Sequence, residues 1–386
     1  MPQNSRVFYQ FLGLHSLLIG IFPFYLPVYL WKEGFSLGAV AFFISLSGLG
    51  FCFGMWVWDR LRWKISLIAL MSVSVLLEVV LLLNIQHLDM DGKVLIMLGL
   101  IYGTYNSFFW TTQRALFFDL ITLDNSGRKY GNFQIFVGLL LQIGILIGGF
   151  LLETTSFIYL LYVSITIGIV GMVFLWRSHP SYPETLVSRP SVRIRDIIKF
   201  KDKEFSRTIF IVDGYYLFLE SFFWVLSLFL LAHESFATLG LIVMVLAVIF
   251  GAFFYILKNT IDKLGRKRIY LFAVSVYGIA WGLRAVVGDQ LTLTMLFFTL
   301  VLITFFTSFF RLAMNKRFYD LAKTTVGHDY LIIKSYYSQM SITVCFGVVA
   351  FVASQTGRSE NLLEPVYWIA AAIAPVFLLY GARRYR

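Results

Sequence analysis

Residues 236–257 read FATLGLIVMVLAVIFGAFFYIL, a run without a charged residue that is long enough to cross a bilayer as one helix. The whole chain has a mean hydropathy of +0.78. Only 14% of its residues are charged, against about 25% in ordinary soluble domains. Eleven similar apolar runs lie at about 8–31, 36–58, 65–84, 94–117, 130–152, 156–176, 208–231, 269–288, 291–315, 330–353 and 363–382. Since a spanning segment must satisfy its own backbone hydrogen bonds, we predict an all-α membrane protein with twelve transmembrane helices.

The distribution of basic residues indicates the orientation of these predicted helices. If the amino terminus is placed on the cytoplasmic side, the inner segments hold most of the 32 Lys and Arg residues. The outer ends and loops then hold only Lys32, Lys93, Arg284 and Arg358. Lys and Arg are enriched in cytoplasmic loops. We therefore expect both termini to be cytoplasmic, in a bacterial-type inner membrane.

The longest polar segment separates six predicted helices from the other six. Three prolines between residues 180 and 190 favour irregular backbone there, and residues 193–207 suit either an amphipathic surface helix or a plain solvated linker. The predicted organisation is an amino-terminal bundle over 1–176, a cytoplasmic linker over 177–207 and a carboxy-terminal bundle over 208–386.

The two predicted bundles carry an internal repeat. Phe109 and Asp119 of the fourth predicted helix correspond to Phe310 and Asp320 of the tenth, at one constant offset. We expect both of these helices to extend beyond the bilayer. A duplicated six-helix unit places its substrate path between the halves, near the middle of the membrane.

Residues 262–268 read Asp-Lys-Leu-Gly-Arg-Lys-Arg and directly follow the eighth predicted helix. This string resembles the loop signature of the major facilitator superfamily, which recurs after the second and eighth helices of that family. A degenerate copy, residues 59–64 (Asp-Arg-Leu-Arg-Trp-Lys), follows the second predicted helix. The resemblance implies two pseudo-symmetric six-helix bundles and transport by alternating access.

The resemblance also implies a cytoplasmic gate. In the family, the acidic and basic residues of these loops engage the neighbouring half and an acidic residue at the end of the fourth or tenth helix. The alternative is that these charges only anchor the topology against anionic headgroups. The residues that we assign to the gate are Asp59, Arg60, Arg62, Asp119, Asp262, Lys263, Gly265, Arg266 and Asp320.

Four glycines of the fifth predicted helix resemble the family's glycine-rich stretch, which lets two helices approach closely. They are Gly138, Gly144, Gly148 and Gly149. The family's antiporters have proline where Gly149 stands, so the direction of transport does not follow from this stretch.

Two carboxyl groups lie within the seventh predicted helix. Asp213 and Glu220 are seven residues apart and are expected on one helix face with Tyr216. If the helix enters the membrane at Thr208, Glu220 lies roughly 18 Å deep at 1.5 Å per residue. No cation is adjacent in sequence, and desolvation destabilises the charged form of a carboxyl at that depth. We therefore predict Glu220, with Asp213, as the proton-coupling site.

The alternative for Asp213 is a structural or gating ion pair with Lys334 or Arg311. His15 and Glu78 are also deep, and we interpret both as residues that pack helices together. A polar stripe on the tenth predicted helix is too long to face lipid. The predicted substrate path consists of Asn106, Arg114, Gln134, Gln142, Tyr216, Thr304, Ser308, Arg311, Lys334 and Ser341.

These features predict a secondary active transporter that is coupled to protons, acts as a monomer and needs no cofactor. The chain has no phosphate-binding loop for an ATP-driven pump, and its scattered basic clusters do not suit nucleic acid. Two cysteines within apolar runs and five separated histidines provide no metal site. The intramembrane cations favour an anionic or zwitterionic small organic solute. The alternatives are efflux of amphipathic or cationic drugs and, from another class, a lipid-modifying enzyme or a non-transporting sensor.

Overall fold

The computed structural model describes residues 3–86, 92–122, 126–178, 190–257, 266–288, 291–355 and 360–381, and these residues form helices and their connections. The helices of the amino-terminal half are α1 (Gln3–Ile21), α2 (Leu26–Lys32), α3 (Leu37–Leu61), α4 (Leu67–Gln86), α5 (Gly92–Leu120), α6 (Ser126–Thr154) and α7 (Phe157–Arg177). Those that follow are α9 (Ile194–Lys199), α10 (Ser206–Phe218), α11 (Trp224–Leu231), α12 (Phe236–Leu257), α13 (Arg266–Val286), α14 (Leu293–Thr324), α15 (His328–Ser354) and α16 (Leu363–Ile373). Shorter turns are η1 (Pro23–Tyr25), η2 (Leu219–Phe223), η3 (Glu360–Leu362) and η4 (Ala374–Gly381).

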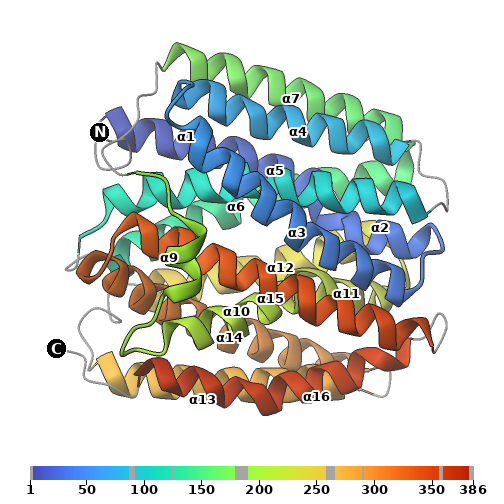
Figure 1. The fold of residues 1–386 in the computed structure, drawn as a ribbon. Coiled ribbons are helices and arrows are strands. Elements are labelled where there is room, and N and C mark those ends of the chain that lie inside the picture. Colours follow the sequence, from blue (N-terminus) through green and yellow to red (C-terminus); the bar gives the residue numbers. More distant parts are fainter. Residues whose placement is uncertain are drawn as a thin grey trace.

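The long helices run side by side, and the two chain termini lie at the same end of the bundle (Figure 1). Within the described residues, 11 helices are long and apolar enough to span a membrane, and a bent pair brings the number to 12. The fourth and tenth spans, α5 and α14, have 29 and 32 residues, which is more than the roughly 20 that a bilayer requires. Twelve spans agree with the sequence prediction.

The first span is broken, whereas the sequence predicted one continuous helix over 8–31. Its two parts meet at η1 with a bend of 42°. Pro23 and Pro27 both lie at or just after the break, and neither has a backbone N–H to donate within a helix. The prolines therefore explain why the apolar run bends instead of continuing.

The seventh span also departs from a regular helix. Between α10 and α11, residues Leu219–Phe223 form the π-helical turn η2. A π turn inserts an extra residue into the helix and is frequent at functional sites. Here the turn contains Glu220, which lies about two turns after Asp213.

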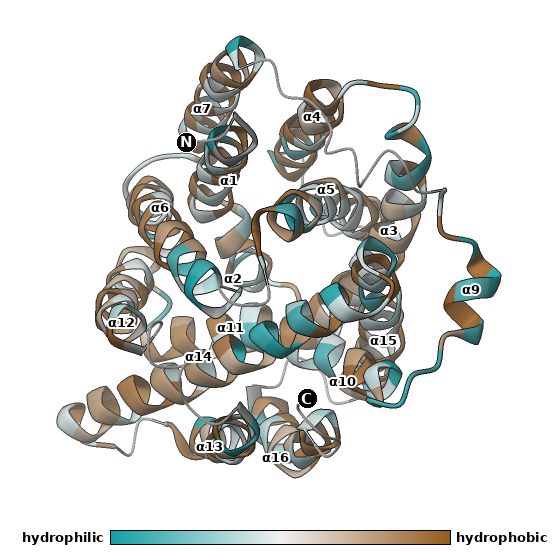
Figure 2. Cartoon of the chain, turned by 90° about the vertical axis from the view of Figure 1, so that its left-hand side faces the viewer, coloured by the Kyte–Doolittle hydropathy of each residue, from teal (hydrophilic) through white to brown (hydrophobic). Residues whose placement is uncertain are grey.

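The two halves of the chain meet along two seams, α3 with α15 and α6 with α12 (Figure 2). Gly48 shows why α3 and α15 can approach so closely, because a Cβ atom at this position would lie 2.6 Å from the Gln339 carbonyl oxygen. Ser45 strengthens the same seam by donating a hydrogen bond to the Thr343 carbonyl at 2.7 Å. These seams enclose the centre of the bundle, where the candidate site lies.

The glycines of α6 pack mainly against α1 within the amino-terminal half. A Cβ atom at Gly144 or Gly148 would collide with the backbone of α1, at Leu17 and Ile21 respectively. Gly149 faces the Tyr25 hydroxyl, but Gly138 faces open space. Three of the four glycines therefore serve close packing, and the expectation for Gly138 is wrong.

The segment between the halves contains one short helix, α9, which lies on the outside of the bundle beside α3 and α15 (Figure 2). Ile194 and Ile198 are exposed, whereas Ile197 is buried and its carbonyl accepts a hydrogen bond from Tyr337 at 2.7 Å. The helix covers fewer residues than the sequence allowed, because Phe200 ends it and α10 begins only at Ser206.

Apolar side chains cover much of the outside of the bundle. Phe150, Tyr255 and Phe351 are each more than half exposed, and the outer faces of the helices are largely hydrophobic in Figure 2. A soluble protein rarely exposes so many large apolar side chains, whereas lipid is a suitable neighbour for them.

Candidate functional site

Four charged side chains from three spans form a buried ion cluster in the carboxy-terminal half. Asp213 of α10 accepts from Arg311 of α14 at 2.5 Å and from Lys334 of α15 at 2.7 Å. Another nitrogen of the same guanidinium, Nε of Arg311, lies 2.9 Å from the Glu220 carboxylate of η2. We call these four residues the central ion cluster. Its two carboxylates and two cations balance each other in charge.

Local packing explains how these groups meet. A Cβ atom at Gly214 would collide with the backbone of Ser338, so glycine lets α10 lie directly against α15. Lys334 precedes Ser338 by one turn and thereby reaches Asp213, which is only 1% exposed. The planar guanidinium of Arg311 then bridges Asp213 and Glu220, a geometry that arginine suits better than lysine.

Tyr277 of α13 completes the environment of Glu220. Its hydroxyl donates a hydrogen bond to the Glu220 carboxylate at 2.6 Å. Glu220 therefore receives both a neutral and a charged hydrogen bond in this conformation. No cation is adjacent to Glu220 in sequence, but the fold supplies one, because Arg311 comes from a span 91 residues away.

The ion pair of Asp213, which the sequence left as an alternative, is present with both Lys334 and Arg311. Burying charges costs solvation energy, which the attraction between the partners offsets. Removing one partner of a buried pair typically lowers the stability of the fold by about 3–5 kcal/mol. The central ion cluster is therefore expected to act as a unit.

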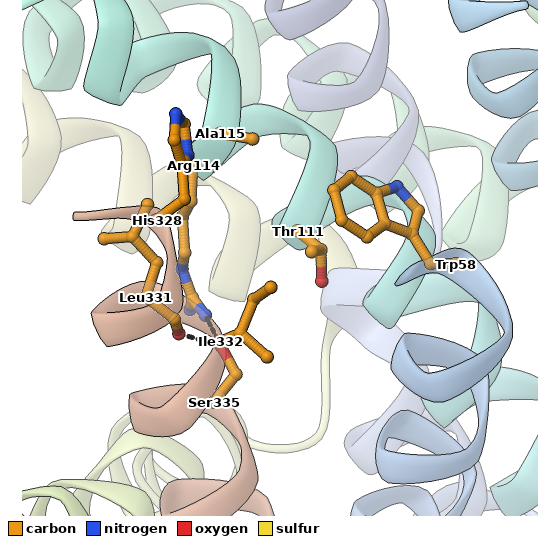
Figure 3. A pocket seen from close by; sticks show the side chains of 8 residues that line it. All are labelled: Trp58, Thr111, Arg114, Ala115, His328, Leu331, Ile332 and Ser335. Carbon is orange, nitrogen blue, oxygen red and sulfur yellow. Dashed lines mark hydrogen bonds between the residues drawn. The ribbon is translucent and has the colours of Figure 1, made fainter. Parts of the chain in front are cut away.

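A pocket lies beside this cluster, between the two halves (Figure 3). Its polar core is Arg114 of α5, whose guanidinium donates a hydrogen bond to the Ser335 hydroxyl at 2.8 Å. Among the described residues, Arg114 forms no ion pair with a carboxylate. The pocket is lined by Trp58, Thr111, Arg114, Ala115, His328, Leu331, Ile332 and Ser335.

The other predicted path residues do not join this cluster. Tyr216 packs against Trp281 and donates its hydroxyl to the Ala370 carbonyl of α16, so it faces the periphery of its half instead of the path. Thr304 donates to its own helix at the Leu300 carbonyl.

The side chains of three further predicted path residues form contacts within their own helices. Asn106 accepts from Trp110 at 3.1 Å, and Gln134 donates to the Tyr130 hydroxyl at 2.6 Å. Ser341 contacts the Cys345 sulfur at 3.7 Å. Ser308 and Gln142 are both half-buried on their helices, α14 and α6.

The sequence places Arg284 among the outer ends and loops, and in the structure it lies in the last turn of α13. Its side chain is buried, donates a hydrogen bond to Thr307 at 2.8 Å, and lies over the rings of Trp281 and Trp224 at 4.4 and 5.0 Å. Aromatic faces attract a cation in this geometry.

At the end of the bundle that holds both termini, the acidic ends of α5 and α14 each contact the opposite half. Asp119 of α5 lies 3.2 Å from His328 of α15, and Asp320 of α14 accepts from Ser126 of α6 at 2.7 Å. Lys316 also pairs with Asp320 at 3.2 Å. His328 was not selected from the sequence, and only its place at the start of the eleventh span could have indicated it.

The last turn of α3 and its C-cap residue bind the segment that joins the two halves. Asp59 pairs with Arg62 at 2.8 Å and accepts from the backbone N–H of Val192 at 2.9 Å. Arg60, by contrast, is exposed and lies over the Trp56 ring at 3.9 Å. Of the second copy of the loop, Asp262, Lys263 and Gly265 lie outside the described residues, as does the Arg266 side chain.

At the opposite end of the bundle, other contacts join the halves. Trp31 donates a hydrogen bond to the Glu234 carboxylate at 3.1 Å, and the Phe236 N–H donates to Glu153 at 2.9 Å. Bonds between the halves therefore occur at both ends, and the Arg114 pocket adjoins the Asp119–His328 contact through His328 itself.

Comparisons with known proteins agree with this architecture. A sequence model of the Major Facilitator Superfamily matches residues 11–315. The fold is similar to the crystal structure of the nucleoside transporter NupG, with 13% identity, a TM-score of 0.67, and 99% of this chain and 98% of that chain covered. The crystal structure of a mutant of the same transporter aligns with a TM-score of 0.71 at 13% identity, covering 99% of this chain and 100% of that one. No curated protein matches the chain in sequence.

Proposed function

The chain belongs to the major facilitator superfamily and is a membrane transporter, and on this premise we propose that it is a secondary active transporter that couples protons to an anionic or zwitterionic small organic solute. The single observation that carries this proposal is the buried central ion cluster beside Arg114, a cation with no carboxylate pair among the described residues. Ionisable groups this deep in a membrane protein are costly and mark transport pathways and proton relays.

The bonds at the two ends of the bundle support transport by alternating access. Opening toward the end that holds the termini requires the bonds of Asp119 and Asp320 to the opposite half to break. Opening toward the other end requires the Trp31–Glu234 bond to break. Few bonds hold each end, so one set can break while the other stays formed. A rocking motion of two halves around a fixed site requires this.

The proton would act on Glu220. In the closed arrangement Glu220 and Asp213 share Arg311, while Lys334 holds Asp213 from the other side. A proton on Glu220 removes its attraction for Arg311, so the guanidinium remains bound to Asp213 alone and the contact between η2 and α14 weakens. Proton binding is thereby linked to the packing of the seventh span against the tenth.

The solute class rests on the charge of Arg114, which lies outside the balanced central ion cluster. Arg311, on which the sequence argument relied, is already neutralised by two carboxylates, so Arg114 carries the argument instead. A guanidinium beside the hydroxyls of Thr111 and Ser335 suits a carboxylate or phosphate group of a solute. The likeness to a nucleoside transporter concerns the fold, and nucleosides therefore belong among the solutes to be tested.

Orientation and assembly complete the proposal. The end that holds the termini also holds Arg60, Arg62 and Lys64, and this excess of Lys and Arg supports a cytoplasmic location for that end. The site lies within one chain between its own halves, which supports a transporter that works as a monomer in an inner membrane.

The test is uptake into proteoliposomes of a panel containing anionic metabolites, zwitterions, nucleosides and amphipathic cations, with and without an inward proton gradient. We expect proton-driven uptake of an anionic or zwitterionic member, with at least a tenfold rise in KM for the Arg114→Gln variant. The exposed Arg177→Gln variant is the matched control and should behave as the parent. Uptake of cations alone, unaffected by Arg114→Gln, would refute the solute class and support the drug-efflux alternative.

A further inference from the structure

A second buried carboxyl group lies in the amino-terminal half, away from the central ion cluster. Glu78 of α4 is 2% exposed, and neither of its carboxyl oxygens has a hydrogen-bond partner of regular geometry. No described Lys or Arg forms an ion pair with it. This environment is opposite to that of Glu220, which Arg311 and Tyr277 both contact.

The groups that surround Glu78 come from each helix packed around it, and none of them is a cation. From α5, the buried Tyr105 hydroxyl lies near the carboxyl group, and it too has no hydrogen-bond partner of regular geometry. From α1, the His15 ring lies against the Tyr105 ring with centroids 6.3 Å apart. From α7, Gly168 contacts Val75 one turn before Glu78, so the buried Ser164 hydroxyl lies near the level of Glu78.

His15 of α1 is a further buried polar group near Tyr105. Its Nε2 lies 2.8 Å from the Ser74 hydroxyl, which also lies 2.7 Å from the Met71 carbonyl and donates its single proton to one of the two. The His15 side chain is 0% exposed, and its Nδ1 has no hydrogen-bond partner.

The energetics decide the state of Glu78. An isolated ionised carboxylate in apolar surroundings costs far more than an isolated neutral carboxyl, and such a group takes up a proton instead. Glu78 therefore holds a proton.

We propose that Glu78, with the Tyr105 hydroxyl as its neighbour, is a second proton-binding site that holds its proton in the closed conformation. The site goes beyond the proposed function and stands whether or not Glu220 carries the coupling proton. Its ligand is the proton itself.

Infrared difference spectroscopy of the purified protein in lipid nanodiscs tests this site. At neutral pH we expect a carbonyl band of a protonated carboxyl that disappears in Glu78→Gln and persists in the matched variant Glu220→Gln. Tyr105→Phe should keep this band and shift its frequency, because the carboxyl loses its hydroxyl neighbour while staying protonated.

If Glu78→Gln does not fold as a monodisperse protein, the Tyr105→Phe spectrum still tests the proposal. A band frequency that Tyr105→Phe leaves unchanged would contradict the assignment. A protonated-carboxyl band that is absent from the parent protein, or unaltered in folded Glu78→Gln, would overturn the proposal. The spectra require no solute, so these outcomes are independent of whether transport is observed.

Discussion

Removing the charge of Asp213 should destabilise the protein, and removing Lys334 as well should restore part of the loss. Asp213 is 1% exposed and lies 2.5 Å from Arg311 and 2.7 Å from Lys334. In Asp213→Asn, Lys334 keeps a buried charge without a carboxylate partner, whereas Arg311 retains Glu220. Breaking one buried pair typically costs about 3–5 kcal/mol.

The double variant Asp213→Asn/Lys334→Gln leaves Glu220 and Arg311 as a balanced pair. We therefore expect the double variant to be more stable than the sum of the two single losses predicts, by about 0.5–3 kcal/mol, the range of coupling energies between residues in contact. The assay is reversible chemical unfolding in detergent of the parent, both single variants and the double variant, with Glu364→Gln as an exposed control. Additive losses would refute the claim that the cluster acts as one charge-balanced unit.

Two further predictions concern the gate and the topology. Asp119→Asn should weaken the contact with His328 and so speed the labelling of a cysteine introduced at Thr111 in the pocket. The labelling rate is measured with a water-soluble thiol reagent on inside-out vesicles. An unchanged rate would mean that these charges only anchor the topology. In a background without the two native cysteines, a cysteine at exposed Glu33 should react from outside intact cells and one at exposed Lys64 only after permeabilisation; the reverse pattern would overturn the orientation.

The spans could be predicted from the sequence because length and hydropathy alone identify them. The bend at Pro23 and the π turn at Leu219–Phe223 could not, since a proline in an apolar run can kink, break or merely begin a helix, and a π turn has no composition of its own.

The site was only partly predictable, for a different physical reason. Asp213, Glu220, Arg311 and Lys334 were each recognisable as costly charges at depth, but their pairing depends on how three helices far apart in sequence pack. The contact of Tyr277 with Glu220 had no sequence signal.

The measurement that tests the central claim most directly is a comparison of exchange and accumulation by Glu220→Gln in proteoliposomes loaded with the solute identified by the uptake panel. Gln keeps the shape of a protonated Glu and the hydrogen-bonding reach toward Tyr277 and Arg311, but it cannot release a proton. The account predicts that solute exchange continues while accumulation driven by a pH gradient is abolished. Full accumulation by Glu220→Gln under the same gradient would contradict it.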